Sequence, residues 1–563
     1  MRAYFCFLLL LCRTATGQVP ARPPSAPDDL CTIQGQVFNA ATGDPVKKAN
    51  LNLQRTDMTT EYNSMPVSYT TVTDASGKFA MKDIEAGKYR LLVNRNGFIT
   101  TSYGARGPNR AGTTLTLLKG QHLSEITFRL TPHGIVTGRI TDDEGEPLSY
   151  VSVQLLTWRY QQGRRQLSYG GGGGSTNDLG EYRIFGVPPG KYYLTATYRN
   201  QSYGVAQDRS ATPEPEDDYV PTYFPGTTDV STAAQVAVPP GGHIQGMDLK
   251  LNKFHTVHVR GHVNYTIPGR QRVMVYLMPK NTMMGMGFRP NQTDAKGDFD
   301  IRGASPGSYA VTAVLNEGSK SYQARANVEV GNSDVDGLTL NIGPGVAITG
   351  KVLVEGPEKP DLSSVRVMLQ QREFLGMMFG PMSQSRIEED RSFTLPDVSR
   401  GLFNVNVMGL PPGYYVKAIR SEQNDILSNG LNTENSPAPL EILISAGAAQ
   451  VSGTVKHPDK GNPVPGATVL LIPQEKERKE QQSYYKQVTS DQNGTFLIKD
   501  LVPGEYRAYA WEDLEPGAYM DPEFMKPVET KGEVVRLEEK AQKTVDLTMI
   551  PAEAGALPQT QIR

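Results

Sequence analysis

Apolar residues along this chain alternate with polar ones over short segments, and each segment ends at a turn rich in Gly, Pro, Asp or Asn. One alternating segment contains Phe79 and Met81, and the segment after the next turn contains Tyr89 and Leu91. A period of two residues places every second side chain on one face of a β-strand. The pattern therefore predicts an all-β protein, and the charged run Gln474–Gln482 is the best window with a helical period.

Three landmarks recur in the same order five times along the chain. The first is a Gly inside an apolar strand: Gly35, Gly138, Gly261, Gly350 and Gly453. The second is a polar turn that ends on an aromatic residue: Asp74–Phe79, Asn177–Tyr182, Asp294–Phe299, Glu389–Phe393 and Asp491–Phe496. The third is an aromatic that follows a second Gly: Tyr89, Tyr192, Tyr309, Phe403 and Tyr506. The fourth copy lacks the Gly of the polar turn, so its pattern is degenerate.

The two recurring turns predict specific hydrogen bonds. In the polar turn, a side chain such as that of Asp74 can accept a bond from the backbone two residues on, and Gly77 can supply a positive φ. In the second turn, Pro followed by Gly, as in Pro189–Gly190, favours a type II turn. We expect the aromatic after this Gly to pack in the core. Where it is Tyr, we expect its hydroxyl to bond nearby backbone, as in a tyrosine corner.

Short strands separated by frequent turns favour a β-sandwich, so the five copies predict a tandem array of Ig-like or prealbumin-like sandwich modules. We predict these segments: signal peptide 1–17, Pro-rich linker 18–30, module one 31–130, module two 131–251 with a loop insert, module three 252–341, module four 342–444, module five 445–551 and tail 552–563. The connections between modules are short, at Thr131–His133 for example. Short connections predict a semi-rigid rod.

The first residues predict export. Met1–Arg2 is a short cationic start, and Ala3–Cys12 is an apolar run too short to cross a bilayer comfortably. Small residues at Ala15 and Gly17 predict cleavage before Gln18. We therefore expect a secreted, periplasmic or cell-surface protein without a transmembrane anchor after cleavage. The mature chain then keeps one cysteine, Cys31, which either cross-links two chains or stays buried.

Composition narrows the class of partner. The chain has 563 residues, a formal net charge of −2, 56 Gly and 40 Pro. A charge near zero gives no reason to expect nucleic acid as a partner. Three Cys exclude a disulfide-stapled scaffold.

Two short motifs resemble catalytic signatures, and both are explained better by the repeat. His122–Glu125 matches part of a zinc-ligand motif, but it lies in the strand that closes module one, and a surrounding catalytic domain is missing. Gly303–Gly307 matches a nucleophile-elbow string around Ser305, but every other module has a turn at this place without Ser. We therefore assign no catalytic residue and expect the protein not to be an enzyme.

Two further groups could suggest metal binding. On a strand, His258 and His262 share a face about 13 Å apart while His255 faces the other way, so the three are poorly placed for one ion. The acidic turn at Asp294 and Asp298 lacks the oxygen ligands of a calcium loop, and its turn role explains the Asp. We predict no metal and no cofactor.

Three loops stand out by composition. Gly170–Gly174 predicts a mobile loop. Met283–Phe288 and Gly376–Met382 are rich in Met, which suits the open end of a sandwich, an apolar partner surface or, less often, Cu(I). Because sugars stack on flat rings, exposed aromatics would favour glycan binding. The candidates are Trp158, Tyr160, Tyr169, Tyr198, Tyr203, Tyr219, Tyr223 and Phe224 in module two, and Trp511 and Tyr519 in module five.

The ordered landmarks resemble the carboxypeptidase regulatory-like domain, most closely in modules one, two and five. The resemblance implies a transthyretin-like (prealbumin-like) sandwich, a fold grouped with carbohydrate-binding types. The segment Tyr219–Gly226 is similar to secreted bacterial proteins that string such modules together.

Three functions remain open from the sequence. The first is a non-catalytic interaction or stalk protein, secreted or at the cell surface, and the second is a dedicated glycan-binding protein. The third is an enzyme or the accessory subunit of an extracellular hydrolase. The partner is accordingly a polysaccharide or a surface protein, and the sequence does not indicate the oligomeric state.

Overall fold

The computed structural model describes residues 29–552 except 57–66, 106, 108–109, 111, 162, 199–216, 266–271, 281–288, 318–319, 358, 373–382 and 436. The predicted signal peptide, most of the Pro-rich linker, both Met-rich segments, Tyr203 and most of the tail lie outside the described residues. None of the helices among the described residues has the length and hydrophobicity needed to cross a membrane.

Module one shows the plan of the array. Its strands are β1 (Cys31–Asn39), β2 (Asn50–Arg55), β3 (Ser68–Val72), β4 (Lys78–Ile84), β5 (Gly87–Asn94), β6 (Thr101–Ser102), β7 (Leu115–Leu117) and β8 (His122–Leu130). One sheet has the order β4-β1-β8, in which β1 is antiparallel to β4 and parallel to β8. The other has the order β3-β2-β5-β6, with β7 also on β5. The apolar faces of the two sheets enclose one core.

Modules two and three follow this plan. Module two contains β9 (Gly134–Thr141), β10 (Val151–Gln161), β11 (Arg164–Ser175), β12 (Glu181–Val187), β13 (Gly190–Tyr198), β14 (Asp217–Tyr219), β15 (Thr222–Tyr223), η3 (Val230–Thr232), β16 (Gln235–Val238), β17 (His243–Ile244) and β18 (Leu249–Lys250). Module three contains β19 (Lys253–His255), β20 (Val257–Tyr265), β21 (Met274–Pro279), β22 (Arg289–Gln292), β23 (Asp298–Ala304), β24 (Gly307–Glu317), β25 (Lys320–Val330) and β26 (Val335–Ile342). The pairing of β14 with β19 joins the two modules.

Modules four and five complete the array. Module four contains β27 (Val346–Glu355), β28 (Arg366–Gln371), β29 (Ser383–Arg386), β30 (Ser392–Val398), β31 (Leu402–Met408), β32 (Tyr415–Ser421), β33 (Asn424–Asp425), α2 (Ile426–Asn429), β34 (Leu431–Asn432) and β35 (Leu440–Ser445). Module five contains β36 (Ala449–Lys456), β37 (Thr468–Pro473), α3 (Lys476–Lys479), η4 (Gln482–Tyr484), β38 (Lys486–Thr489), β39 (Thr495–Leu501), β40 (Gly504–Trp511), η5 (Ala518–Met520), α4 (Pro522–Met525), η6 (Lys526–Lys531), β41 (Glu533–Leu537), β42 (Gln542–Thr544) and β43 (Leu547–Ile550). The predicted all-β array of sandwiches is confirmed, and the charged run after Gln474 does contain a short helix.

The first landmark Gly and the aromatic after the polar turn form a packing pair. A Cβ on Gly261 would lie 2.1 Å from the carbonyl oxygen of Leu338 and 2.6 Å from Cζ of Phe299. The opening strand therefore fits between the closing strand and the aromatic ring only without a side chain. The other four landmark glycines are equally crowded. This contact explains why two features far apart in sequence recur together.

The polar turn forms as predicted. Oδ1 of Asp74 accepts hydrogen bonds from the N–H groups of Ser76 (2.9 Å) and Lys78 (2.8 Å), and these bonds, the Lys78 bond foremost, lower the pKa of Asp74. Gly77 has a φ of 73°. In the degenerate fourth copy, Arg391 takes over the positive φ at 66°. A side-chain-capped turn thus precedes the aromatic in every module.

The tyrosine corner is confirmed, but the predicted type II turn is wrong. The hydroxyls of Tyr89, Tyr192, Tyr309 and Tyr506 each donate to the carbonyl four residues earlier, at 2.7–2.8 Å. In a type II turn the landmark Gly would have φ near +80°. Instead φ is 153° at Gly504, and the left-handed residue lies four positions earlier, at Asp500 with φ of 54°. A bulge in the preceding strand β39, and not the Pro–Gly pair, changes the direction of the chain here.

The glycine run of module two is a strand and not a mobile loop, which corrects the prediction. Residues 170–174 belong to β11, which pairs with β10. A Cβ on Gly170 would lie 2.3 Å from Cγ2 of Thr157, and one on Gly171 would lie 2.8 Å from Cβ of Leu155. The glycine run therefore lets β11 approach β10 closely. Close approach of two strands is a reason for Gly within a strand that does not involve flexibility.

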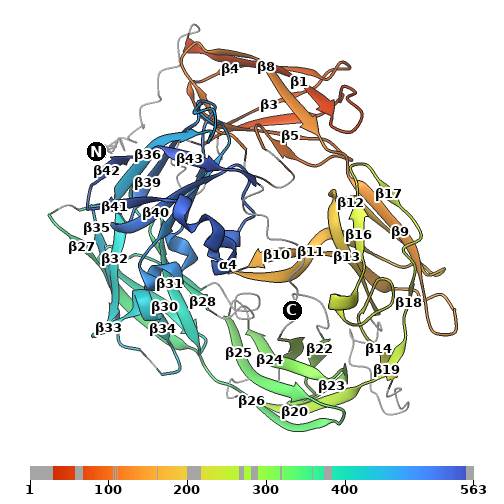
Figure 1. Ribbon diagram of the computed structural model, residues 1–563. Helices are drawn as coiled ribbons and strands as arrows, with labels where there is room; N and C mark the ends of the chain where they lie inside the picture. Colours follow the sequence, from red (N-terminus) through yellow and green to blue (C-terminus); the bar gives the residue numbers. More distant parts are fainter. Residues whose placement is uncertain are drawn as a thin grey trace, which may run out of the picture.

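The array is closed and is not a rod, which corrects a second prediction. Figure 1 shows the five modules arranged in a ring. Near the centre of the ring, α4 of module five lies beside β10 and β11 of module two. The Tyr160 and Phe524 rings lie 6.0 Å apart edge to face. Tyr160 also belongs to an apolar cluster otherwise built from module five. Because contacts between modules join chain segments far apart, short linkers alone do not set the shape.

Module five also contacts module one directly. The side chain of Gln492 bonds the backbone of Thr116 twice, accepting from its N–H (3.0 Å) and donating to its carbonyl (2.8 Å). Arg110 forms an ion pair with Asp513 at 2.8 Å and donates to the carbonyl of Leu514. The last module therefore returns to the first and closes the array.

Candidate functional site

A dense group of charged side chains lies on the outer face of one sheet of module three. Val257 and Val259 of β20 fill the core, so His258 and Arg260 point outward. Asp300 of β23 lies opposite Arg260 in the strand register. This charged face also includes Asn291, Arg302, Asp334 and Asp336.

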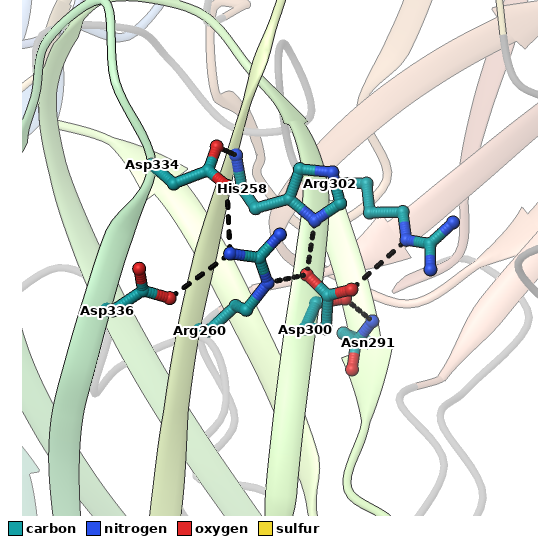
Figure 2. Close-up of polar contacts among 7 residues, drawn as sticks. All are labelled: His258, Arg260, Asn291, Asp300, Arg302, Asp334 and Asp336. Carbon is teal, nitrogen blue, oxygen red and sulfur yellow. Dashed lines mark hydrogen bonds and ion pairs between the residues drawn. The ribbon is translucent and has the colours of Figure 1, made fainter. Parts of the chain in front are cut away.

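Figure 2 shows that Asp300 is the centre of this charged face. Its carboxylate lies 2.7 Å from Nδ1 of His258 and accepts a hydrogen bond from Nε of Arg302 at 3.1 Å. Arg260 bonds Asp334 at 2.8 Å and Asp336 at 3.1 Å through its Nη1. Each charge therefore has at least one partner of opposite sign.

The pKa shifts on this face favour the charged forms. Burial alone would lower the pKa of Arg260, but its hydrogen bonds with Asp336 and Asp334 outweigh burial and raise it. The N–H of His258 donates to Asp334 and lowers the pKa of that carboxyl, assisted by Arg260. This network therefore has the character of a cross-strand electrostatic support.

The histidines chosen from the sequence do not converge. His258 bonds Asp300, and Nδ1 of His262 bonds Asp298 at 2.7 Å, so each ring has its own carboxylate. Asp294 uses its carboxylate to accept the N–H groups of Lys296 and Asp298 within the polar turn. Across the described ranges, no group of three or more His, Cys, Asp or Glu residues is arranged to hold a metal ion.

The two motifs that resemble catalytic signatures have local structural roles. Nδ1 of His122 lies 2.7 Å from the hydroxyl of Thr32, and Glu125 occupies a bulge with φ of 66°. The carbonyl of Ser305 accepts the Tyr309 hydroxyl at 2.8 Å, which is the tyrosine corner of module three. Cys31 is fully buried, and its thiol donates to the carbonyl of Leu118 at 3.0 Å.

The aromatic residues suggested for sugar stacking are largely internal. Trp511 is 1% exposed and stacks on Tyr509, while Tyr160 fills the contact between modules two and five. Trp158 is half-buried, with the Arg165 guanidinium 5.8 Å from its ring centroid. The described candidates therefore form cores and interfaces, and sequence could not reveal this because it does not specify which strand face is covered.

The described residues line two clefts between modules, and sequence reasoning missed both. One of about 860 Å³ lies between modules one and five and is lined largely by Thr and Ser, with Lys88, Arg90 and Asp491. The other, of about 620 Å³, lies between β25 of module three and the 399–402 turn of module four. Because each wall comes from a different module, no pattern within one repeat could indicate these clefts.

The contact between modules four and five carries a compact charge network. Lys417 lies 2.7 Å from Glu355 and 3.0 Å from Glu539, and the Tyr415 hydroxyl donates to Glu539 at 2.9 Å. The hydrogen bond from Lys417, foremost, lowers the pKa of Glu539. Burial, with the bond to Glu539, raises the pKa of Tyr415 to about 12.

These shifts predict how pH affects the contact. A lowered carboxyl pKa gives stability above the ordinary pKa of about 4.5, and this is lost as pH falls through the folded value. A raised tyrosine pKa gives stability below pH 10, and this is lost as pH rises through about 12. We expect Glu539→Gln to lower the melting temperature at pH 7, and we expect this loss to shrink progressively as pH falls below 4.5. A loss that stays the same as pH falls would contradict the role of this carboxylate.

Comparison with known families identifies the class of the terminal modules. Residues 32–131 and 450–549 match the carboxypeptidase regulatory-like domain. Modules one and five are therefore carboxypeptidase regulatory-like domains, as the sequence landmarks predicted. Comparison with curated proteins gives no match.

The similar solved structures are bacterial proteins with low sequence identity to this chain and low TM-scores. The minor pilin GBS52 of Streptococcus agalactiae is 12% identical, with 40% of this chain and 96% of that chain covered and a TM-score of 0.22. The major pilin subunit BcpA of Bacillus cereus is 12% identical, with 74% and 99% covered and a TM-score of 0.15. The TIE protein of Bacillus anthracis is 10% identical, with 74% and 75% covered and a TM-score of 0.15. Function must therefore be argued from the residues of this chain.

Proposed function

We propose that this chain is a non-catalytic binding protein that acts outside the cytoplasm, either secreted or at the cell surface. The observation that carries the proposal is a pair of clefts that each take their walls from two modules, one where module five closes against module one and one between modules three and four. Such clefts exist only in the assembled chain. Binding therefore fits this arrangement better than the role of a spacer or stalk, since a spacer gains reach from an extended array.

A protein partner is favoured over a polysaccharide. The glycan hypothesis depended on named aromatic rings, and those that the structure describes are buried or half-buried. The exposed rings of Tyr150, Phe185 and Phe254 line neither cleft. The clefts instead present hydroxyl, amide and charged side chains. Backbone and side-chain groups of a polypeptide can hydrogen-bond such walls without a stacking platform.

Two measurements test the proposal. Mass spectrometry of the chain from extracellular and envelope fractions of its source cells should find a mature N-terminus at Gln18. The mature chain, immobilised, should then be screened against a random-peptide phage library and a polysaccharide panel. Saturable binding to either class supports a binding protein. Retention in the cytoplasm, or no binding to either class, would overturn the proposal.

A further inference from the structure

We propose that the cleft between modules three and four binds an extended peptide segment of a partner protein, which lies along the edge of β25. This inference rests on the proposed function and adds the site and the class of ligand. The cleft measures about 620 Å³ and takes one wall from each module.

The first wall is an edge strand. Among the described strands, β25 pairs with β24 alone, so its other edge has no partner in the sheet. Six consecutive residues of β25, Tyr322–Asn327, line the cleft. An unpaired strand edge presents a row of backbone donors and acceptors to which another strand can add. A run of six residues spans about 20 Å, which suits a peptide of similar length.

Both walls of the cleft hold polar atoms that lack a hydrogen bond. Three residues lining the cleft have a buried atom of this kind: Thr312 Oγ1, Gln323 Nε2 and Gln371 Oε1. Thr312 is only 2% exposed. Gln323 and Thr312 belong to module three, whereas Gln371 belongs to module four. An unpaired buried polar atom is unfavourable, and all three atoms belong to residues that line the cleft. Gln323 and Gln371 are half-buried, so rotation of their side chains would present the amides to a ligand.

The chemistry of these walls favours a peptide. Gln323 offers a donor and Gln371 an acceptor, and every peptide unit carries one of each. Asn327, Asn341 and Asn432 extend this hydrogen-bonding surface, and the charged residues of the lining are Arg325, Arg400 and Glu434. The aromatic residue among the lining residues is Tyr322, which is 5% exposed and packs into the core, so it provides no face for a sugar ring.

The test uses variants that remove the unpaired atoms without harming the fold. Gln323→Leu and Gln371→Leu replace half-buried side chains, each with one buried unpaired atom, by apolar groups of similar size, so thermal stability should be kept or raised. Gln370→Leu is the matched control, because Gln370 is exposed, bonds Asn406 and does not line the cleft. Peptides enriched from the phage library on the full mature chain would be synthesised and titrated against all three variants.

We expect each cleft variant to weaken peptide binding at least tenfold, and Gln370→Leu to change it less than twofold. Peptide affinity unchanged by both cleft variants would overturn the cleft assignment and leave the proposed function standing. Binding of a polysaccharide that both cleft variants abolish would assign the cleft to sugar and overturn the peptide inference. Absence of any enriched peptide would overturn the inference, and absence of polysaccharide binding as well would overturn the proposed function too.

Discussion

Gly261→Ala should strongly destabilise module three. The new Cβ would lie 2.1 Å from the carbonyl oxygen of Leu338 and 2.6 Å from the ring of Phe299. Relief requires either the closing strand β26 or the core ring to move, and both are held by their own sheet and core contacts. Overpacking of a core usually costs about 1–3 kcal/mol, and a backbone clash belongs at or above the top of that range. Chemical denaturation of the mature chain should show the loss.

Gly331→Ala is the matched control in the same module. A Cβ there would meet nothing within 4 Å, and its φ is not in the left-handed region. We expect this control to leave stability unchanged within about 0.5 kcal/mol. If the two variants unfolded at the same denaturant concentration, the packing of the landmark Gly against the aromatic would not be what the repeat preserves.

Tyr506→Ala should unfold module five and thereby open the array. Tyr506 is 1% exposed, and its hydroxyl donates to the carbonyl of Val502 at 2.8 Å. Truncation of a large buried ring costs about 3–5 kcal/mol. Because module five supplies Phe524 to the contact with module two and Gln492 to that with module one, both contacts should loosen. Hydrogen exchange should increase throughout module five and at Thr116.

Tyr506→Phe separates the two parts of this effect. The ring remains and one hydrogen bond is lost, so the expected cost is about 1 kcal/mol. Exchange at Thr116 should stay near the wild-type rate in this variant. Normal protection at Thr116 in Tyr506→Ala would show that module five is not what holds the array closed.

The sequence allowed prediction of features that depend on neighbouring residues. The polar turn at Asp74 and the corner hydroxyl of Tyr506 depend on residues two to four positions away, so their pattern is visible in every copy. The prediction of a type II turn was wrong because the residue with positive φ lies in a strand bulge, at Asp500 in module five. Three modules have Asp at this bulge position, although Gly is the usual residue for a positive φ. Backbone twist at a bulge leaves little compositional signal.

Features that depend on contacts between modules could not be predicted. Tyr160 and Phe524 meet across the array, and Gln492 reaches Thr116, yet each residue is ordinary for its own strand or loop. The same holds for the cleft residues Gln323 and Gln371, whose unpaired atoms are recognisable only once two modules are placed together. For the glycine run 170–174, composition gave a wrong prediction of mobility. The structure shows instead that Gly is needed there because a side chain would clash with Thr157.

Small-angle X-ray scattering of the mature chain tests the closed array most directly. Closure predicts a radius of gyration of about 25–30 Å, near that of a compact protein of this length. Five modules end to end would instead give roughly 50 Å, judged from the size of a domain of about 100 residues. A value near 25–30 Å that rises when Tyr160 and Phe524 are both replaced by Asp would agree with the structure. A wild-type value near 50 Å would contradict it.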